Sequence, residues 1–403
     1  MAKRILVYTN HFYPEQFKVN EIVDWLSKED THIRVITGIP NYPKGRFYKG
    51  YGFFSIFNNK YKNNVVVNRM PLIPRGNGNY FLRTLNYITY FISTFFFTIY
   101  LIIFKEKYEV IFVHHTSPIL IAIHPIIYGF FYKTRKYLWN LDLWPDTLKA
   151  MGLVKLKLIY ELIEMSVFFI YSFYDKILIG SKSFKMSIES RYSGEVLYFP
   201  NWADEIIEKN TFYNNVDIQV PDDHFVIMYT GNIGIAQGFD RLHHTIKKLI
   251  NQKVFWIFIG DGSYKKIFKK NIEKNNTNNK CLFIDQISVD MIPSYVRLAD
   301  ALFLSLKCND LFSKTVPAKL QTYMSLSKPI IANIQGESAD IIKQSRTGFI
   351  DETKDQSNLA DIIKQIINMD QNELDFLGKR ANKFYEKNYH SKLRKSQLLE
   401  LFI

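Results

Sequence analysis

Amine and hydroxyl side chains gather around a predicted helix start near residue 317. Ser313, Lys314 and Thr315 precede Pro317, which suits a first helical position because its missing N–H would have no partner there. Lys319 follows within the first predicted turn. Unpaired N–H groups and the helix dipole favour an anion at a helix start, and the two lysines add positive charge. The stretch predicts a phosphate site, although a helix with a solvated basic start would look the same.

Buried strands and glycine-rich loops surround this helix in the sequence. Apolar runs at 225–229 and 254–259 predict buried strands, and Ile330 to Ala332 predicts another after Pro329 ends the helix. The first run leads into Gly231-Asn232, and Gln237-Gly238 precedes a further helical stretch. Glycines allow a backbone to approach a ligand closely, so this loop is a second candidate for phosphate contact.

Composition indicates a globular protein with an uneven charge. The 403 residues are 47% hydrophobic, carry a net charge of +14 and contain two cysteines, Cys281 and Cys308, too few for a disulfide framework or a zinc site. Residues 1–200 hold 25 Lys/Arg and 14 Asp/Glu, a net charge of +11, and no acid occurs from Thr31 to Lys105. Such a basic region suits an acidic membrane surface, a lipid diphosphate or nucleic acid, or a merely basic soluble domain.

The first half alternates predicted strands and helices. Strands are expected at 3–9, 33–37, 65–69, 110–113, 137–141, 175–179 and 196–199, with helices at 18–28 and 117–132. In doubly wound sheets, ligands bind beyond the carboxyl ends of the strands. Asn10 and Glu15 follow the first strand, His115 ends the fourth and Asp142 ends the fifth. These side chains are therefore candidates for contact with a substrate, while Glu15 and Asp142 could instead stabilise helix starts.

An uncharged run from Tyr87 to Phe104 predicts a long apolar helix. Its 18 residues are flanked by Arg83 and Lys105, which makes it borderline for a membrane span. It contains several threonines and lies where an α/β domain needs a helix, so a buried or interface-lying helix is expected. The loop at 38–64 interleaves aromatic and basic residues, a composition that suits a membrane interface.

In this order the motifs resemble the nucleotide-sugar half of GT-B retaining glycosyltransferases, specifically glycosyltransferase family 4. The resemblance covers 225–352 well and the whole chain in layout. It implies an α/β fold of two Rossmann-like domains facing across a cleft, with boundaries at 1–201 and 202–376 and a crossover helix at 377–403. Tyr13-Pro14-Glu15 resembles part of the family's P-P-E-x-G-G loop, and Pro200-Asn201 resembles its P-N-G hinge.

The resemblance also assigns site residues, with several departures. The donor diphosphate would meet Gly231, Asn232, Gln237 and Gly238, where much of the family has Gly-Arg and Lys-Gly. Positive charge must then come from Lys319, or from Lys314, Arg241 or Lys307. The family's Glu-x7-Glu pair falls on Lys314 and Thr322, so Thr322 or the neighbouring Gln321 would meet the ribose. The remaining assignments are Ser313 to the donor, Gln286 and Ile287 to the base, Asp142 to catalysis in place of a histidine, and Asn10, Glu15 and His115 to the acceptor or sugar.

The implied activity is transfer of a sugar with retention and without a metal or other cofactor. The donor would be a nucleotide diphosphate sugar, most simply a UDP sugar. Its sugar could be an N-acetyl amino-deoxyhexose such as N-acetyl-fucosamine. The acceptor would be a polyprenyl-diphosphate-linked saccharide of O-antigen or capsule synthesis, at the inner face of the cytoplasmic membrane. The alternatives are a non-hydrolysing UDP-sugar 2-epimerase and a non-catalytic GT-B-like binding or assembly partner; no nucleic-acid fold signature is present.

Overall fold

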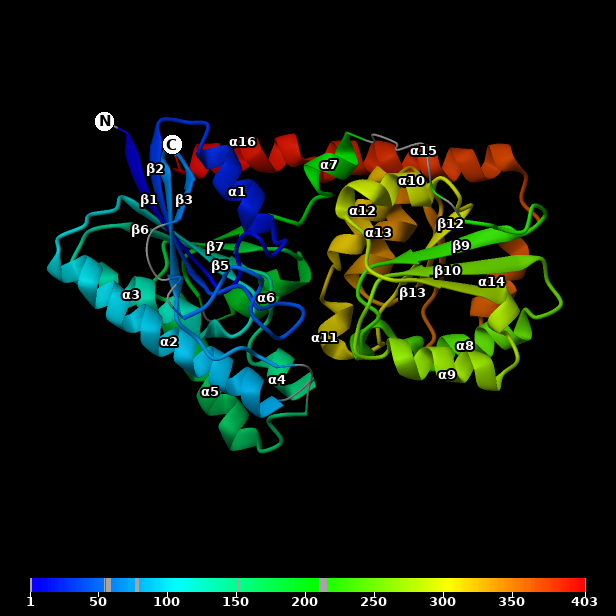
Figure 1. Ribbon diagram of the computed structural model, residues 1–403, viewed down its shortest axis with the longest axis horizontal. Helices are drawn as coiled ribbons and strands as arrows, with labels where there is room; N and C mark the ends of the chain where they lie inside the picture. Colours follow the sequence, from blue (N-terminus) through cyan, green and yellow to red (C-terminus); the bar gives the residue numbers. More distant parts are fainter. Residues whose placement is uncertain are drawn as a thin grey trace. The chain divides into compact units, whose positions relative to one another are not determined.

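The computed structural model describes residues 2–402 except 54, 56–58, 77–79, 151, 191, 210–215 and 217. Phe54, one of the aromatic residues in the loop at 38–64, therefore lies outside the described residues. The chain forms two compact units (Figure 1). The first contains residues up to Pro200 together with those from Lys395 onward, and the second runs from Asn201 to Arg394.

The first unit is built on an eight-stranded sheet in the order β3-β4-β2-β1-β5-β6-β7-β8. The described pairings are parallel except the one between β3 and β4. The central strands are buried on both faces, as their apolar runs require. The strands are β1 Lys3–Thr9, β2 Thr31–Gly38, β3 Asn59–Lys62, β4 Val65–Met70, β5 Val110–His115, β6 Arg135–Asn140, β7 Lys176–Ile179 and β8 Glu195–Tyr198.

The helices of the first unit include one whose buried stripe is polar. Helix α2 turns Asn86, Tyr90, Thr94 and Thr98 inward, and the Tyr90 hydroxyl donates to the Thr9 carbonyl at 2.8 Å. It begins seven residues before the predicted start. The helix predicted at 117–132 is shorter, a 3-10 turn followed by α3. The helices are α1 Lys18–Leu26, α2 Tyr80–Ile103, α3 Ile123–Gly129, α4 Asp146–Ala150, α5 Lys157–Tyr171 and α6 Ser183–Glu189.

The second unit has a six-stranded sheet whose pairings are all parallel, in the order β11-β10-β9-β12-β13-β14. The strands are β9 Phe225–Thr230, β10 Val254–Ile259, β11 Cys281–Ile284, β12 Ala301–Ser305, β13 Ile330–Asn333 and β14 Gly348–Asp351. The helices are α7 Glu205–Glu208, α8 Phe239–Lys248, α9 Lys265–Lys274, α10 Ile292–Val296, α11 Asp310–Ser313, α12 Ala318–Ser325, α13 Glu337–Ser345, α14 Leu359–Ile366, α15 Gln371–Asn388 and α16 Ser391–Phe402, the last crossing into the first unit.

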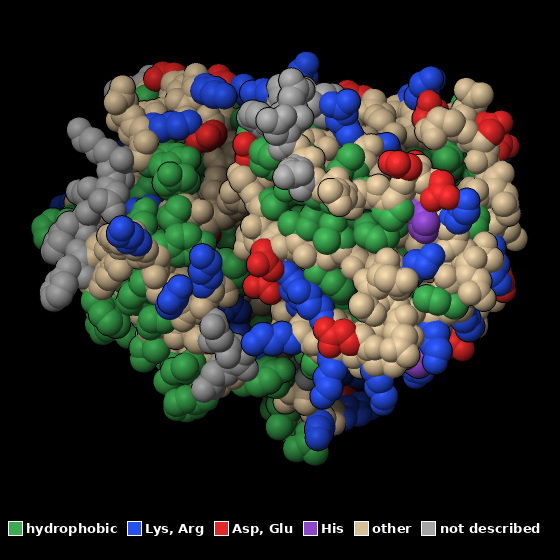
Figure 2. All heavy atoms as spheres, turned by 45° about the vertical axis from the view of Figure 1, so that its right-hand side comes forward, with side chains coloured by type: hydrophobic (Ala, Val, Ile, Leu, Met, Phe, Trp, Pro, Cys, Tyr) green, Lys and Arg blue, Asp and Glu red, His purple; other side chains and the backbone are tan. Residues whose placement is uncertain are grey.

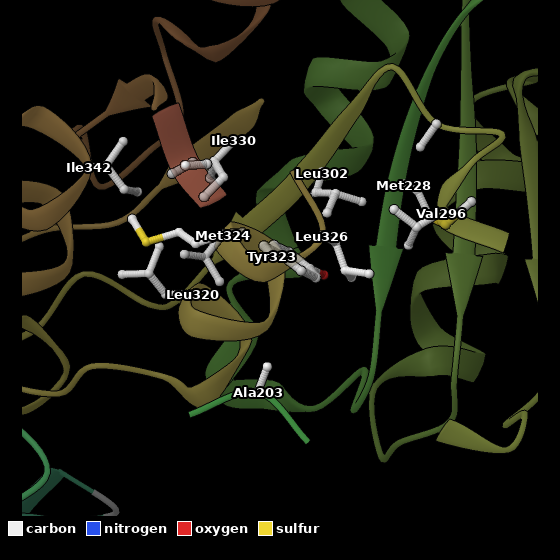
Figure 3. Close-up of a cluster of buried hydrophobic side chains, with 14 of the residues drawn as sticks. Ala203, Met228, Val296, Leu302, Leu320, Tyr323, Met324, Leu326, Ile330 and Ile342 are labelled. Carbon is white, nitrogen blue, oxygen red and sulfur yellow. The ribbon is translucent and has the colours of Figure 1, made fainter. Parts of the chain in front are cut away.

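Apolar side chains cover both faces of the second sheet. On one face, Met228 and Leu302 pack with Leu320, Tyr323 and Met324 of α12 (Figure 3). On the other face, alternate residues of the same strands pack beneath α8 and α14. The Thr230 amide donates to the Tyr323 hydroxyl at 2.9 Å, which fixes α12 beside the end of β9. The predicted fold class, with two Rossmann-like α/β sheets, is confirmed.

The strand orders mark one place on each sheet where a ligand is expected. The chain leaves β1 toward β2 and β4 and then returns to β5, on the other side of β1. In the second unit it leaves β9 toward β10 and β11 and returns to β12. Ligands in such sheets bind at the carboxyl ends of the strands where the order reverses. A ligand is therefore expected at the loops after β1 and β5 and at those after β9 and β12.

The C-terminal segment returns to the first unit later than the predicted Leu377. Helix α15 packs on the second unit because Gly378 lies against the Ser327 carbonyl and Asn382 donates to the Ser325 carbonyl at 3.1 Å. From Lys395 onward the chain belongs to the first unit, where the Phe402 ring packs on Phe112 and Tyr137. The crossover is therefore divided between two helices.

Replacing Gly378 by alanine tests this packing. A Cβ at Gly378 would lie 2.1 Å from the Ser327 carbonyl oxygen, a backbone atom that cannot move aside freely. We expect Gly378→Ala to lower the free energy of unfolding by about 1–3 kcal/mol despite alanine's better helix propensity. Chemical denaturation measures the change. Gly52→Ala, whose added Cβ would meet nothing within 4 Å, is the control, and an equally small effect at both sites would contradict the packing.

Candidate active site

The loop after β9 lies directly against Lys319. Gly231 has a φ of +115°, and a Cβ there would come within 2.7 Å of the Lys319 Cε. Gly238, with a φ of +70°, begins α8 and leaves room for the Ser305 side chain at the end of β12. Both glycines are thus required by conformation and by close approach. The structure brings four predicted donor residues, Gly231, Asn232, Gln237 and Gly238, into one loop beside Lys319.

The amine of Lys319 is held by neutral groups. Its Nζ donates to the Gln237 Oε1 at 3.0 Å and to the Tyr229 hydroxyl, and it lies 4.5 Å from the centre of the Tyr229 ring. Among the described residues no carboxylate lies within ion-pair distance of it. Burial lowers the pKa of Lys319 to about 7. An anion bound here would favour the protonated lysine, so the site is prepared for a negative ligand.

The other predicted donor residues occupy different positions. Gln286 and Ile287 follow β11, and Ile287 packs against the core of the second unit. Ser313 ends α11, where its hydroxyl donates to the Asp310 carbonyl at 2.9 Å, and Lys314 is the next residue. The Thr322 hydroxyl donates to the Ala318 carbonyl of its own helix at 3.1 Å. The neighbouring Gln321 is fully buried, and its side-chain amide has no hydrogen-bond partner among the described residues.

A small cavity of about 170 Å³ opens beyond Gly238. It contains two of the cations proposed from the sequence as alternatives to Lys319, namely Arg241 and Lys307, and also an acid, Asp240. The lining is completed by Cys308, Asn333, Lys354 and Gln356. The cavity continues the carboxyl edge of the sheet from β12 to β13.

In the first unit, Glu15 braces two loops. The carboxylate is buried and accepts hydrogen bonds from the backbone N–H groups of Asn41 and Tyr42 at 2.6 Å each. Its other oxygen lies 2.7 Å from the His11 Nδ1. This role differs from the alternative of a helix-start carboxylate, and the contact with sugar stays a prediction. Glu15 instead holds His11, whose ring stacks on Phe17.

Asp142 is fixed at the end of β6 by hydroxyl groups. Ser117 donates to one carboxylate oxygen and Thr147, in α4, donates to the other at 2.5 Å. The Thr147 contact joins Asp142 to the first turn of α4 through a side-chain hydroxyl, and no backbone N–H of α4 is seen to donate to Asp142 among the described residues. Because a carboxylate oxygen can accept more than one hydrogen bond, these contacts leave acceptor capacity for a substrate hydroxyl.

His115 and Asn10 bring unpaired polar atoms to the same edge of the sheet. The His115 Nδ1 lies 2.5 Å from the Asn140 Oδ1, and its Nε2 is buried without a partner among the described residues. Burial lowers the pKa of His115, which favours a neutral ring. The Asn10 amide donates to the Ser117 carbonyl at 3.0 Å, whereas its Oδ1 has no partner in the described part of the chain. Buried polar atoms without partners at the carboxyl edge of a sheet are groups to which a bound ligand could hydrogen-bond.

Sequence reasoning missed three residues of this edge: His11, Asn140 and Arg69. His11 lies four residues before Glu15, a spacing that could have been noticed, but only the folded loop brings the two side chains together. Asn140 and Arg69 end ordinary strand patterns and carry no local signal. In the part of the chain that the structure describes, no three His, Cys, Asp or Glu side chains form a group that could hold a metal ion.

Comparisons with known proteins show which proteins the chain is similar to. Residues 214–389, within the second unit, match the model of the family described as "Glycosyl transferases group 1". WcaI of Escherichia coli (strain K12), provisionally named a colanic acid biosynthesis glycosyl transferase, is 22% identical over 341 residues, covering 80% of this chain and 81% of WcaI. WbjE of Pseudomonas aeruginosa, provisionally named a glycosyltransferase, is 24% identical over 262 residues, covering 62% of this chain and 63% of WbjE.

Solved structures define the fold. Sucrose-phosphate synthase from Thermosynechococcus elongatus has a TM-score of 0.77 at 15% identity, covering 99% of this chain and 98% of that one. Alr3699/HepE from Anabaena, solved in complex with UDP and glucose, has a TM-score of 0.68 at 14% identity and covers 99% of each chain. The chain therefore has the GT-B fold, as predicted. The family match and the two relatives support a glycosyltransferase at this coarse level.

The lowered pKa of Lys319 predicts a pH dependence of stability. Between pH 7 and the ordinary lysine pKa of 10.5, the unfolded chain binds a proton at this residue that the folded chain does not. The free energy of unfolding should therefore rise with pH in this window, by up to about 1.4 kcal/mol per pH unit from this group. Denaturation at pH 6 and pH 9 should show this rise in the wild type relative to Lys319→Met. Parallel pH profiles of the two proteins would contradict it.

Proposed function

We propose that this protein is a retaining glycosyltransferase of cell-surface polysaccharide synthesis. It transfers a sugar from a nucleotide diphosphate donor, most simply a UDP sugar, to a lipid-linked saccharide. The sugar that we propose is an N-acetyl amino-deoxyhexose, the class that the resemblance of the sequence implies. The name of WcaI supports the polysaccharide role, and the UDP complex of Alr3699/HepE supports the donor class. The "Glycosyl transferases group 1" match favours transfer over epimerisation.

The observation that carries the proposal is the position of Lys319. It lies in the first turn of α12, against the backbone of Gly231 and within hydrogen-bond reach of Gln237. When the glycosidic bond to the donor breaks, negative charge develops on the leaving diphosphate. A fixed ammonium group and backbone N–H groups stabilise that charge more in the transition state than in the ground state. Lys319 thus supplies the positive charge that a bound metal ion supplies in other enzymes.

The reaction exchanges one bond to the anomeric carbon for another. The acceptor hydroxyl oxygen forms a bond to this carbon as the carbon–oxygen bond to the diphosphate breaks, and the nucleoside diphosphate leaves. With attack on the face of the leaving group, configuration is retained, and the hydroxyl proton passes to a diphosphate oxygen. Asp142 accepts a hydrogen bond from the acceptor and orients the attacking hydroxyl. Asn10 and His115 contribute further polar contacts at that edge.

Substitution of Lys319 tests the donor side. Lys319→Ala should reduce kcat/KM by roughly 100-fold or more if this ammonium is the main electrostatic donor to the leaving group. The measurement is transfer from a UDP sugar to a lipid-linked acceptor, followed as release of UDP. Lys343→Ala is the control, since Lys343 belongs to the same unit but pairs at the surface with Glu352. Near-wild-type turnover in Lys319→Ala would refute the assigned role.

We also propose that the first unit lies on the inner face of the cytoplasmic membrane. Helix α2 is long and apolar enough to span a membrane, the one such helix among the described residues. Its polar stripe, however, is bound to β1 and to the loop after β4, since the Tyr8 and Thr98 hydroxyls lie 3.1 Å apart and Asn86 donates to the Ile73 carbonyl at 2.7 Å. These contacts favour a helix that lies along a bilayer over one that crosses it.

The outward face of this unit is apolar. It combines exposed residues of α2, of the turn after α3, and of α5, and hydrophobic side chains gather at the lower left of Figure 2. We call this set the apolar face: Phe81, Ile88, Ile92, Phe96, Tyr100, Ile103, Phe104, Phe130, Phe131, Leu158, Leu162, Met165 and Phe169. Lysines flank the ends of its helices at Lys105, Lys107 and Lys157, although α5 also carries Glu161 and Glu164. Apolar rings with flanking lysines suit an anionic lipid surface.

Serine substitutions test the apolar face. Replacing Phe96, Phe130 and Phe169 together should weaken binding to vesicles of phosphatidylglycerol and phosphatidylethanolamine by about tenfold or more, because each ring contributes apolar burial. Sedimentation with vesicles measures the partition. The matched control replaces Met186, Ile267 and Phe376, which are exposed elsewhere. Equal sedimentation of both triple variants and the wild type would count against this surface.

A further inference from the structure

Arg69 is a buried cation with two unsatisfied nitrogens. It is the penultimate residue of β4 and only 3% exposed. Its Nη2 donates to the Tyr13 carbonyl at 2.9 Å. The Nε and Nη1 atoms are buried and have no hydrogen-bond partner among the described residues. Leaving a buried charged group without partners is costly, so a ligand or solvent at this position must offset the cost.

No acid of the described residues neutralises Arg69. Burial lowers the pKa of Arg69, and the nearby Tyr51 and Glu15 side chains oppose this shift only in part. The Glu15 oxygens bind the backbone of Asn41 and Tyr42 and the ring of His11, and no ion pair joins Glu15 to Arg69 among the described residues. Because an arginine keeps its proton at physiological pH, the positive charge remains.

Arg34 shows how the same sheet treats a structural arginine. It lies on β2, next to β4, and its Nη2 reaches both oxygens of Glu106 at 2.8 and 3.1 Å. Its Nε donates to the Tyr108 hydroxyl at 2.6 Å and its Nη1 to the Asn68 amide oxygen at 2.9 Å. All three of its nitrogens are satisfied. The contrast indicates that Arg69 lacks a partner from outside the chain.

The surroundings of Arg69 suit an anion. The Arg69 guanidinium lies 5.0 Å from the centre of the Tyr51 ring, and Arg75 lies at the same distance from the Tyr42 ring. Thr37, the register partner of Arg69 on β2, has a buried hydroxyl without a partner among the described residues. The sequence from Thr31 to Lys105 contains no acid, so Glu15 is the acid that acts electrostatically on Arg69. The site lies at the carboxyl edge of the sheet, where ligands bind.

We propose that Arg69 binds a phosphoryl group at the carboxyl end of β4. This inference rests on the proposed function and names the part of the acceptor that the first unit recognises. The phosphoryl oxygens come either from the diphosphate that links the saccharide to its lipid or from the head group of an anionic membrane lipid. Guanidinium N–H groups form charge-assisted hydrogen bonds to either one, with the Thr37 hydroxyl as a further donor.

The test compares three variants of the full chain in the presence of saturating UDP. Geranyl diphosphate, but not geraniol, should raise the melting temperature of the wild type. Arg69→Gln should weaken geranyl diphosphate binding at least tenfold while melting no lower than the wild type without ligand, since it removes an uncompensated buried charge. Arg69→Lys, which keeps the charge without the planar guanidinium, should bind geranyl diphosphate with intermediate affinity. It replaces Arg69→Gln in the test if the glutamine variant does not fold. Arg34→Gln should melt lower yet keep its affinity.

Vesicles distinguish the two sources of phosphate. If Arg69→Gln loses geranyl diphosphate but still sediments with phosphatidylglycerol vesicles, the ligand is the acceptor diphosphate. If vesicle binding falls as well, Arg69 also binds lipid head groups. Unchanged affinity for both probes, or a lowered melting temperature with unchanged affinity, would overturn the proposal. Because UDP binding is measured separately on each variant, failure of the donor site would be seen independently of Arg69.

Discussion

The candidate donor site depends on a lysine that is held without a carboxylate. Lys319 is partly buried, bound by a tyrosine hydroxyl and a glutamine oxygen, and packed against the backbone of a glycine. A carboxylate beside Lys319 would raise its pKa toward the ordinary value and would neutralise its charge. Neutral partners fix the ammonium in place and leave its charge for the ligand. The glycine at 231 follows from this arrangement, because a Cβ would displace the lysine.

The rest of the second unit positions that ammonium. Helix α12 presents Leu320, Tyr323 and Met324 to the core, and the Tyr323 hydroxyl is bonded to the end of β9. Lys319 projects from the same turn, so burial of the apolar stripe fixes the distance between the lysine and the glycine loop. The first unit repeats the principle with Arg69, which is buried beside a carboxylate that other groups already occupy. In each unit, a basic side chain without an ion-pair partner among the described residues thus lies at the carboxyl edge of a sheet.

Much of the fold could be predicted from the sequence, because apolar runs of strand length alternate with helical stretches and every predicted strand is present. Lys319 and its loop could also be predicted, since glycines and a helix start leave a local signal. Arg69 and Asn140 could not, because their importance comes from partners, or missing partners, far away in the chain. The bonds from the Glu15 carboxylate to the backbone at 41 and 42 could not be predicted either, because those residues are distant in the chain. Hydropathy revealed helix α2 without revealing that its threonines, and not its phenylalanines, face the sheet.

The central claim, that Lys319 receives a nucleoside diphosphate, is tested most directly by titration calorimetry of the full chain with UDP at pH 7.5 in buffers of different ionisation enthalpy. Binding of the diphosphate should raise the pKa of Lys319 from about 7. The account therefore predicts that UDP binds with net uptake of protons and that Lys319→Met abolishes this uptake. Absence of binding, or the same proton uptake in both proteins, would contradict the account.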